Sequence, residues 1–448
     1  MQNGYLKIVG LHILIGILVY FSRALGDVYF YGIVAYFFFK IFTAAVPMKS
    51  FEIIKACAYV LGAEVLLRMT GSGLFYESSK YLVVVFTIMG LFYKGFNLRA
   101  TPYVLYVLLL IPGIYVSLYA LDVSADIRKA VAFNLSGPVC LGLAALFCMG
   151  VSITRSQLEQ IINFAVYPLI STVIYIVAFN PNVSEVVAST GSNFVTSGGF
   201  GPNQVSTVLS LGAFFMTVKF FMFTKTRVMR YVDLAFILLF SFRAIVTFSR
   251  GGVLTAIIMV ACFIFFQYRF MDRNKKSSML ISIVLFIGVI TATWVYSSIQ
   301  TNGLITNRYA NENARGEEKQ DVTTGRVFLI KKELEEFFEN PFLGVGVGRI
   351  KDLRFQETGI QAASHNEMSR IVAEHGLLGV IAFAIILFVP LLFRLRDRNN
   401  VLFFSFYFFW FLTINHSAMR IAAPAFIYAL SLLHIRHDQP RLHREQIK

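Results

Sequence analysis

A histidine and an amide stand directly before an apolar run in SHNEMSRIVAEHGLLG, Ser364 to Gly379. Ser364 followed three residues later by Glu367 is the pattern of a capping box, which predicts a helix with Ser364 as N-cap and His365 at its first position. The partial positive charge of a helix N-terminus disfavours imidazolium, so we expect a lowered pKa for His365. A neutral imidazole can accept a proton, which makes His365 the candidate general base, with Ser364, Asn366 and Glu367 as supporting residues.

Charged residues continue along the same predicted helix. Arg370 has the spacing for ion pairs with Glu367 and with Glu374, and we expect both pairs on an exposed face, with Met368 facing inward. His375 is the competing histidine of this segment. It ends the short helix beside a glycine, where a capping or interfacial role is expected.

Three arginines are candidates for holding an anion near His365. Arg250 lies in TFSRGG at the end of an apolar segment, where a charge is costly unless it meets an anion or a carboxylate. Arg308 and Arg326 lie in the long polar segment that follows. The planar guanidinium fits phosphate oxygens, so several arginines together would hold a lipid diphosphate. The alternative for each is a headgroup contact or a snorkelling anchor.

The polar segment also contains TTGRVFLIKKELEEFFENPFLGVG, which predicts an amphipathic helix that begins at Arg326 and ends at Asn340-Pro341. One face carries Val327, Ile330, Leu334 and Phe337 or Phe338, and the other carries Lys331, Lys332, Glu335, Glu336 and Glu339. Such a helix lies flat on the outer leaflet or packs on other residues of the loop. GVGVG, 344–348, lacks the spacing of a phosphate-binding loop and is interpreted as a flexible turn with tight backbone geometry.

The composition indicates the class of protein to which these residues belong. Of 448 residues, 57% are hydrophobic and only 15% are charged, with a mean hydropathy of +0.67, which predicts a polytopic membrane protein. The net charge of +15 comes from short basic clusters between apolar runs, so it indicates membrane topology rather than nucleic acid binding. The cysteines and acidic residues show no metal-type spacing, and no metal or other cofactor is predicted. The cysteines are Cys57, Cys140, Cys148 and Cys262.

About 12–14 membrane-spanning helices are expected from the apolar runs, since a span needs about 20 mostly apolar residues. The runs lie near 6–22, 27–45, 51–69, 80–95, 102–121, 131–152, 159–179, 204–223, 231–248, 251–270, 279–299, 376–396, 399–415 and 421–435. The basic clusters 225–230, 273–276 and 394–398 fall on one side with the basic tail, and this side is predicted to be the cytoplasm. Residues 180–203, the turn 249–252 and the segment 300–375 are then outside.

The expected fold is therefore all-α, with one long periplasmic loop that contains short amphipathic helices. We divide the chain into N-terminal transmembrane helices (1–179), central transmembrane helices (180–299), a periplasmic catalytic loop (300–375), C-terminal transmembrane helices (376–435) and a cytoplasmic tail (436–448). A loop as long as 300–375 usually carries function. The candidate chemistry is expected there.

His365-Asn366, followed by nine residues and then Gly376-x-x-Gly379, resembles the histidine segment of the O-antigen ligase and polymerase superfamily. ENPFLGVGVG and TFSRGG resemble two further segments of that superfamily in the same order, so the similarity covers roughly 199–379. The resemblance implies a metal-independent, inverting glycosyltransferase of the GT-C type in the bacterial inner membrane, which works at the periplasmic face on a glycan carried by undecaprenyl diphosphate. It implies that His365 is the base for the acceptor hydroxyl and that Arg250 and Arg326 hold the diphosphate.

The first reading is an O-antigen ligase-like enzyme that transfers the glycan to a lipid A-core acceptor. A polymerase that uses a second lipid-linked repeat unit is the alternative, followed by a protein O-oligosaccharyltransferase, and a non-catalytic exporter or flippase is the alternative from another class. Val380 and Ala382 stand where ligase motifs often have Thr and Trp, whereas 180–204 lacks the Lys and Arg that polymerases often place in an earlier loop. Asn203 in GPNQ contacts sugar or caps a helix in this interpretation.

Overall fold

The computed structural model describes residues 2–120, 127–321, 323, 325–359 and 364–436. The helices are α1 (Gln2–Phe21), α2 (Arg23–Thr43), α3 (Val46–Thr70), α4 (Ser78–Lys94), α5 (Thr101–Leu109), α6 (Ile111–Ala120), α7 (Ile127–Cys148), α8 (Arg155–Phe179), α9 (Pro202–Val218), α10 (Arg227–Ile245), α11 (Arg250–Arg269), α12 (Arg273–Gln300), α13 (Leu304–Ala310), α14 (Arg326–Glu339), α15 (Arg349–Thr358), α16 (Glu367–Arg396), α17 (Phe403–His416) and α18 (Ala422–Ser431). Short helical turns η1 (Leu98–Ala100), η2 (Val183–Glu185) and η3 (Lys219–Phe223) and strands β1 (Ser152–Thr154) and β2 (His434–Arg436) complete the elements.

The protein is an all-α, multi-pass membrane protein. Nine helical segments in the described ranges are long and apolar enough to cross a membrane. Every predicted span overlaps a helix, and five predicted spans, in α3, α4, α10, α17 and α18, are shorter or more polar than those nine. The fold class is thus confirmed, and an exact number of spans stays a prediction.

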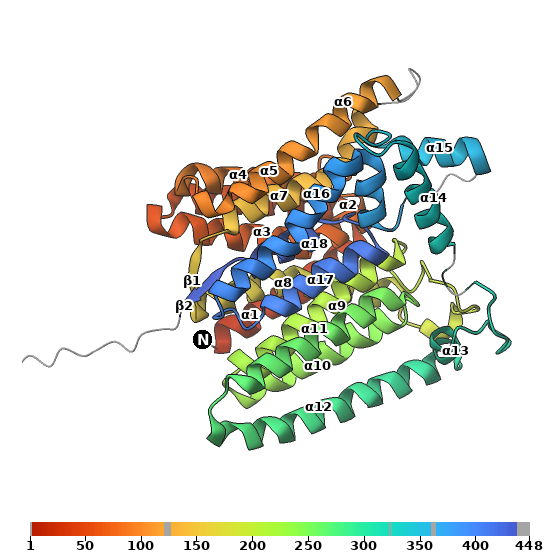
Figure 1. Cartoon of the computed structure of the whole chain (residues 1–448). Helices are drawn as coiled ribbons and strands as arrows, with labels where there is room; N and C mark the ends of the chain where they lie inside the picture. Colours follow the sequence, from red (N-terminus) through yellow and green to blue (C-terminus); the bar gives the residue numbers. More distant parts are fainter. Residues whose placement is uncertain (1, 121–126, 322, 324, 360–363, 437–448) are drawn as a thin grey trace, which may run out of the picture.

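The long helices run side by side, with α12 along one edge of the bundle (Figure 1). Two of them approach closely because Gly62 of α3 has no side chain; a Cβ atom there would lie 2.3 Å from the carbonyl oxygen of Ala165 in α8. Tyr428 of α18 lies in the interior, where its hydroxyl hydrogen-bonds that of Tyr103 at 2.9 Å and donates to the Ile386 carbonyl at 2.8 Å. This part of the core is therefore aromatic, and the hydroxyl groups of these two tyrosines are paired.

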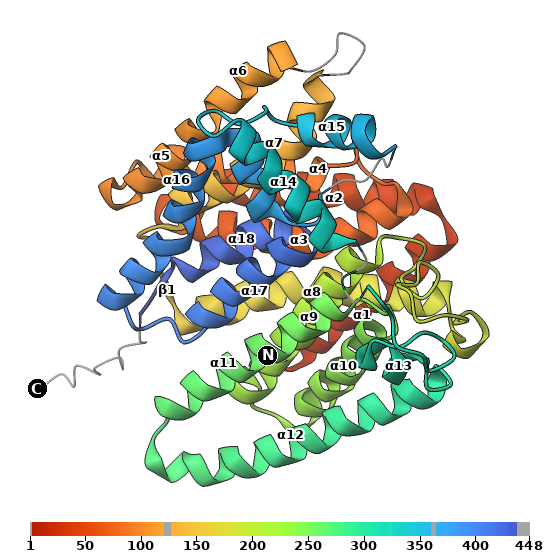
Figure 2. The same ribbon diagram turned by 45° about the vertical axis from the view of Figure 1, so that its right-hand side comes forward.

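One end of the bundle carries β1 and β2, and the other carries α13, α14 and α15 (Figures 1 and 2). The two strands pair in parallel, with Ser152 opposite His434 and Thr154 opposite Arg436. Lys275 and Arg436 line one cavity at this end together with Met222, close to the first basic cluster, and Asn399, directly after the third. The predicted basic clusters therefore meet at one end. That this end faces the cytoplasm remains a prediction.

Candidate functional site

The turn between α10 and α11 sets the position of Arg250. It is held against α9 and α17 by two glycines: a Cβ atom at Gly251 would lie 2.5 Å from the His416 ring, and one at Gly252 would lie 2.6 Å from the carbonyl carbon of Ser206. Ser206 Oγ also donates to the Ser249 carbonyl at 3.0 Å. TFSRGG therefore needs its glycines for the close packing that fixes the arginine.

Alanine at Gly252 should destabilise the protein by about 1–3 kcal/mol, because the added methyl group meets backbone that cannot rotate away. Gly288→Ala is the matched control: it also lies inside a helix, and a Cβ there meets nothing within 4 Å. Since alanine is the better helix former, the control should be neutral or slightly stabilising. Thermal unfolding in detergent compares the two, and equal transitions would contradict the packing described here.

Arg250 and Arg308 are joined through the backbone. Arg250 Nη1 donates to the Arg308 carbonyl at 3.3 Å and to the side chain of Asn311, and Arg308 Nε donates to the Phe248 carbonyl at 3.2 Å. Phe248 has a positive φ of 60°, unusual for a bulky residue, and a small apolar core around Ile305 and Val246 holds the turn in place. Both guanidinium groups are therefore positioned before any ligand arrives.

The third predicted arginine completes a group of positive charges. Arg326 begins α14 after Gly325, as predicted. Burial lowers the pKa of Arg326, and the charge of Arg250 lowers it further; the pKa of Arg308 is lowered by burial and by Arg250 and Arg326. The salt bridges of the described residues give neither Arg308 nor Arg326 a carboxylate partner. Such a group favours a bound anion.

Lys319 extends this positive region. Its ammonium group donates to Thr190 Oγ1 at 2.7 Å, which ties the α12–α14 connection to the α8–α9 loop. Burial lowers its pKa, followed by the charges of Arg308 and Arg250. The three predicted outer segments, 180–203, 249–252 and 300–375, are thus brought together at one end of the bundle.

His365 lies just outside a helix, and the predicted capping box is wrong. The N-cap of α16 is Asn366, whose Oδ1 accepts from the backbone N–H of Ser369 at 3.1 Å, and the helix begins at Glu367. Ser364 Oγ instead accepts from the Asn366 N–H at 3.2 Å. Asn competes well with Ser as a cap, so the helix starts later than the Ser-x-x-Glu pattern predicted. His365 therefore precedes the N-cap.

The expected lowering of the His365 pKa is found, with a different main cause. Burial is the largest contribution, and the charges of Arg420, Arg326, Arg354 and the nearby His416 follow; together they lower the pKa to about 4. The imidazole is half-buried and, within the described residues, its nitrogens form no hydrogen bond. A neutral ring with both nitrogens available can accept a proton from a ligand hydroxyl.

His365 and Arg326 line the same narrow cleft. It lies between α14, residues 364–366 and the end of α17, where Asn415 Oδ1 accepts from Asn366 Nδ2 at 3.0 Å. Arg420, which follows α17, donates from Nη2 to the Ser364 carbonyl at 2.9 Å. The histidine segment is therefore held by the end of α17 and by the connection between α17 and α18.

The ion pairs of Arg370 with Glu367 and Glu374 form as predicted, but on a buried face. The exposed fractions are 6%, 2% and 1%, respectively, whereas Met368 is exposed at 36%. The reason is that Glu367 accepts from the Met419 N–H at 3.2 Å and Arg370 donates to the Asn134 carbonyl at 3.0 Å. These charges bind α16 to neighbouring elements instead of facing solvent.

The glycine run 344–348 packs against a break in α16 and is not a flexible turn. Its three glycines have φ of 72°, 91° and 85°, so the tight geometry was predicted correctly. Val345 N–H donates to the Ala373 carbonyl at 3.0 Å and Gly348 N–H donates to Glu374 Oε1 at 2.8 Å. The break itself lies at Gly376, with φ 60° and ψ −140°. ENPFLGVGVG and the histidine segment 364–379, the two segments that resemble the superfamily here, therefore stabilise each other.

His375 stands at this break, and the predicted interfacial role is wrong. The ring is 1% exposed, and both nitrogens are buried without a hydrogen-bond partner. It packs on α6, since a Cβ atom at Gly113 would lie 2.3 Å from its Nδ1. His375 therefore has a packing role, and His365 remains the histidine that faces the cleft.

The predicted amphipathic helix α14 ends at Glu339, as expected, and packs on α16 through a buried carboxylate. Glu333 is fully buried; it pairs with Arg354 of α15 at 2.9 Å and accepts from Ser369 Oγ at 2.5 Å. Val327, Leu334 and Phe338 remain exposed at 46%, 39% and 75%. One face thus packs on protein, and the apolar face is available to lipid.

The model of the O-antigen ligase family matches residues 234–384. The chain carries an O-antigen ligase domain. This confirms the resemblance to the O-antigen ligase and polymerase superfamily. A comparison with curated proteins finds no match to this chain.

The O-antigen ligase domain contains seven of the eight predicted site residues, and the structure brings them to one end: Arg250, Arg308, Arg326, Ser364, His365, Asn366 and Glu367. Two groups beside it come from outside the domain. His416 is the last residue of α17, and its Nε2 lies 3.3 Å from Thr207 Oγ1. Arg420 lies in the connection that follows α17. Sequence reasoning missed both, although a polar run NHSAMR inside an apolar region was a signal for them.

Asn203 of α9 also lies outside the O-antigen ligase domain and contacts its arginine turn. Its Oδ1 accepts from Ser249 Oγ at 2.7 Å, directly before Arg250. The helix N-cap is Gly201, so the predicted capping role of Asn203 is wrong. A contact with sugar is not tested by this geometry. The hydrogen bond gives Asn203 a role in positioning the turn.

Proposed function

We propose that this protein is a membrane glycosyltransferase that transfers a glycan from undecaprenyl diphosphate to a lipid A-core acceptor at the periplasmic face. The observation that carries the proposal is the cleft in which an uncharged His365 lies beside Arg326, one of a group of buried and half-buried arginines. An imidazole that accepts a proton and guanidinium groups that hold an anion are the two parts that this reaction needs. The O-antigen ligase domain supports the same class of reaction.

The reaction is a displacement at the anomeric carbon of the donor sugar. The acceptor hydroxyl forms the new C–O bond while His365 takes its proton, and the bond from the same carbon to the diphosphate oxygen breaks. Arg326, Arg250 and Arg308 stabilise the negative charge on the leaving diphosphate. Attack opposite the leaving group inverts the anomeric carbon, and no cofactor takes part in this scheme.

The pH dependence should separate the free enzyme from the donor complex. His365 acts in its deprotonated form, so kcat/KM should be constant from pH 6 to 8 and fall only as the pH drops through about 4, the pKa set by burial and the arginines. A bound diphosphate offsets the charges of Arg326 and Arg420, which favours imidazolium; the inflection in kcat should therefore lie at higher pH. An inflection in kcat/KM near pH 6.5 would contradict a desolvated base.

A reconstituted assay identifies the acceptor. The full chain in liposomes receives a labelled polyprenyl-diphosphate glycan together with a lipid A-core acceptor, a second lipid-linked repeat unit or an acceptor protein. We expect consumption of donor with lipid A-core. Product with the second repeat unit alone would favour the polymerase, product on protein alone the oligosaccharyltransferase. Movement of intact donor across the bilayer without transfer would favour the exporter and overturn the proposal.

A further inference from the structure

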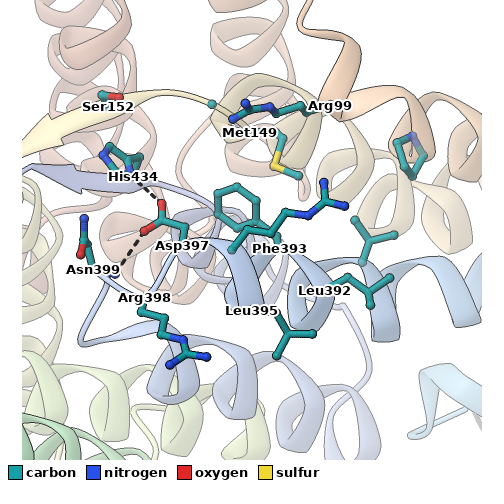
Figure 3. Close-up of a pocket in the computed structure, with 14 residues that line it drawn as sticks. Arg99, Met149, Ser152, Leu392, Phe393, Leu395, Asp397, Arg398, Asn399 and His434 are labelled. Atoms are coloured by element: carbon teal, nitrogen blue, oxygen red, sulfur yellow. Dashed lines mark hydrogen bonds and ion pairs between the residues drawn. The ribbon is translucent and has the colours of Figure 1, made fainter.

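A cavity of about 840 Å³ lies at the end of the bundle that carries β1 and β2, opposite the His365 cleft. Its walls come from the start of α5, the α7–α8 turn, the end of α16 and β2. Figure 3 shows Arg99 beside Met149 on one wall, with Asp397 and His434 across from them. Nothing in the proposed transfer reaction uses this cavity.

The basic residues near the cavity fall into two groups. Lys94 donates to the carbonyls of Phe147 and Met149 at 2.9 and 2.6 Å, and the Arg394 guanidinium lies 5.4 Å from the centre of the Phe403 ring. These two have partners inside the protein. They serve the packing of this end rather than a ligand.

Three other arginines line the cavity: Arg99, Arg396 and Arg398. All three side chains are exposed, and within the described residues their guanidinium groups form no ion pair and no hydrogen bond. The acid of the lining, Asp397, is already engaged, since its Oδ2 lies 2.5 Å from His434 Nδ1 and its Oδ1 accepts from the Asn399 N–H at 3.1 Å. Within the described residues, the cavity therefore has three arginines and one carboxylate in its lining, and that carboxylate is bound to His434 and the Asn399 N–H instead of to the arginines.

The same cavity has an apolar wall that continues onto the outside of the bundle. Leu392 and Leu395 of α16 line it and are exposed at 61% and 68%, and Pro102 and Val389 lie beside them. α16 is among the helices long and apolar enough to cross a membrane, so these leucines lie on a surface suited to lipid chains. A soluble anion would match the arginines and leave this wall unused.

We infer that this cavity binds the phosphate of an anionic phospholipid. The phosphate lies among Arg99, Arg396 and Arg398, and the acyl chains follow Leu392 and Leu395 along α16. Basic pockets between helix ends are suited to anionic lipids because guanidinium groups bind phosphate oxygens while the chains stay in hydrocarbon. A bound lipid joins α5, α16 and the β1–β2 pair and should stabilise this end.

The test titrates the purified full chain in neutral detergent with phosphatidylglycerol, and measures binding by native mass spectrometry and stability by thermal unfolding. Phosphatidylglycerol should raise the unfolding temperature, whereas phosphatidylcholine should not. The combined variant Arg99→Gln, Arg396→Gln, Arg398→Gln should bind phosphatidylglycerol on the order of 100-fold more weakly, about fivefold for each arginine. Arg99→Gln alone should show the fivefold loss if the combined variant does not fold.

The matched control removes three exposed arginines from the same end but outside the cavity, as Arg227→Gln, Arg230→Gln, Arg273→Gln. This control should bind phosphatidylglycerol as the unaltered chain does. Equal binding by the cavity variant and the unaltered chain would overturn the inference, as would equal stabilisation by phosphatidylcholine. Glycerol phosphate, which has no chains, should not stabilise the protein; if it does so as well as the lipid, the cavity is a site for a soluble phosphate.

Discussion

Alanine at His365 should lower the rate of glycan transfer by about 10²–10⁴-fold while the donor still binds, because the imidazole is needed for proton transfer and not for holding the diphosphate. The ring has no hydrogen-bond partner among the described residues, so its removal should leave the fold intact. Single-turnover transfer from a labelled polyprenyl-diphosphate glycan gives the rate. Donor binding is measured on the same preparation.

His375→Ala provides the contrast for this experiment. His375 fills space beside Gly113, is almost completely buried and does not line the His365 cleft, so its removal should lower the unfolding temperature and leave the transfer rate per folded molecule unchanged. If His375→Ala lost transfer in the folded protein while His365→Ala retained it, the assignment of the base would be wrong.

Alanine at Arg326 or Arg250 should weaken donor binding by about 10- to 150-fold each, because each variant loses a hydrogen bond between charged groups. Arg326→Lys should fall between alanine and the unaltered chain, since lysine keeps the charge and loses the planar pair of donors. Titration of the protein with a labelled polyprenyl diphosphate measures these affinities directly.

Arg315→Ala is the matched control for the arginines. Arg315 lies in the same connection between α12 and α14 and carries the same charge, but its side chain is exposed. It is not among the charges that chiefly lower the pKa of His365, Arg308 or Arg326. It should bind donor as the unaltered chain does. A loss of affinity as large as that of Arg326→Ala would indicate a general effect of charge instead of a diphosphate site.

The site residues that sequence could identify are charged or polar groups next to apolar segments. Arg250 and His365 stand out because a charge or an imidazole at such a position needs a reason, and the basic clusters on the other side of the spans assign them to a common end. The structure brings both to that end with Arg308 and Arg326. Topology alone was sufficient for this part of the prediction.

The details that sequence could not supply depend on contacts between distant segments. Ser364 and Asn366 are both good N-caps, and only the fold shows that the Asn366 side chain reaches Ser369 N–H. Glu367 and Glu374 have ordinary surface spacing; their burial follows from contacts with Met419 and Gly348. No local pattern encodes these partners.

The number of spans also depends on contacts between distant segments. α3 contains the predicted span 51–69 but is not among the nine described helices that are apolar enough to cross a membrane by composition. It carries the buried pair Glu64–Arg68, and the interior of the bundle surrounds it. Glu64 is satisfied there by the Ala422 N–H at 2.6 Å as well as by Arg68. A helix buried inside a bundle can carry paired charges that lipid would not tolerate.

The most direct test of the central claim is labelling of a cysteine at position 365. His365→Cys is placed in a chain whose four native cysteines are replaced, and intact cells are treated with a membrane-impermeant thiol reagent. We expect labelling from outside the inner membrane, and protection against it by a polyprenyl-diphosphate donor held by the neighbouring arginines. Labelling that requires access from the cytoplasm, or labelling that the donor does not slow, would contradict a diphosphate site beside His365.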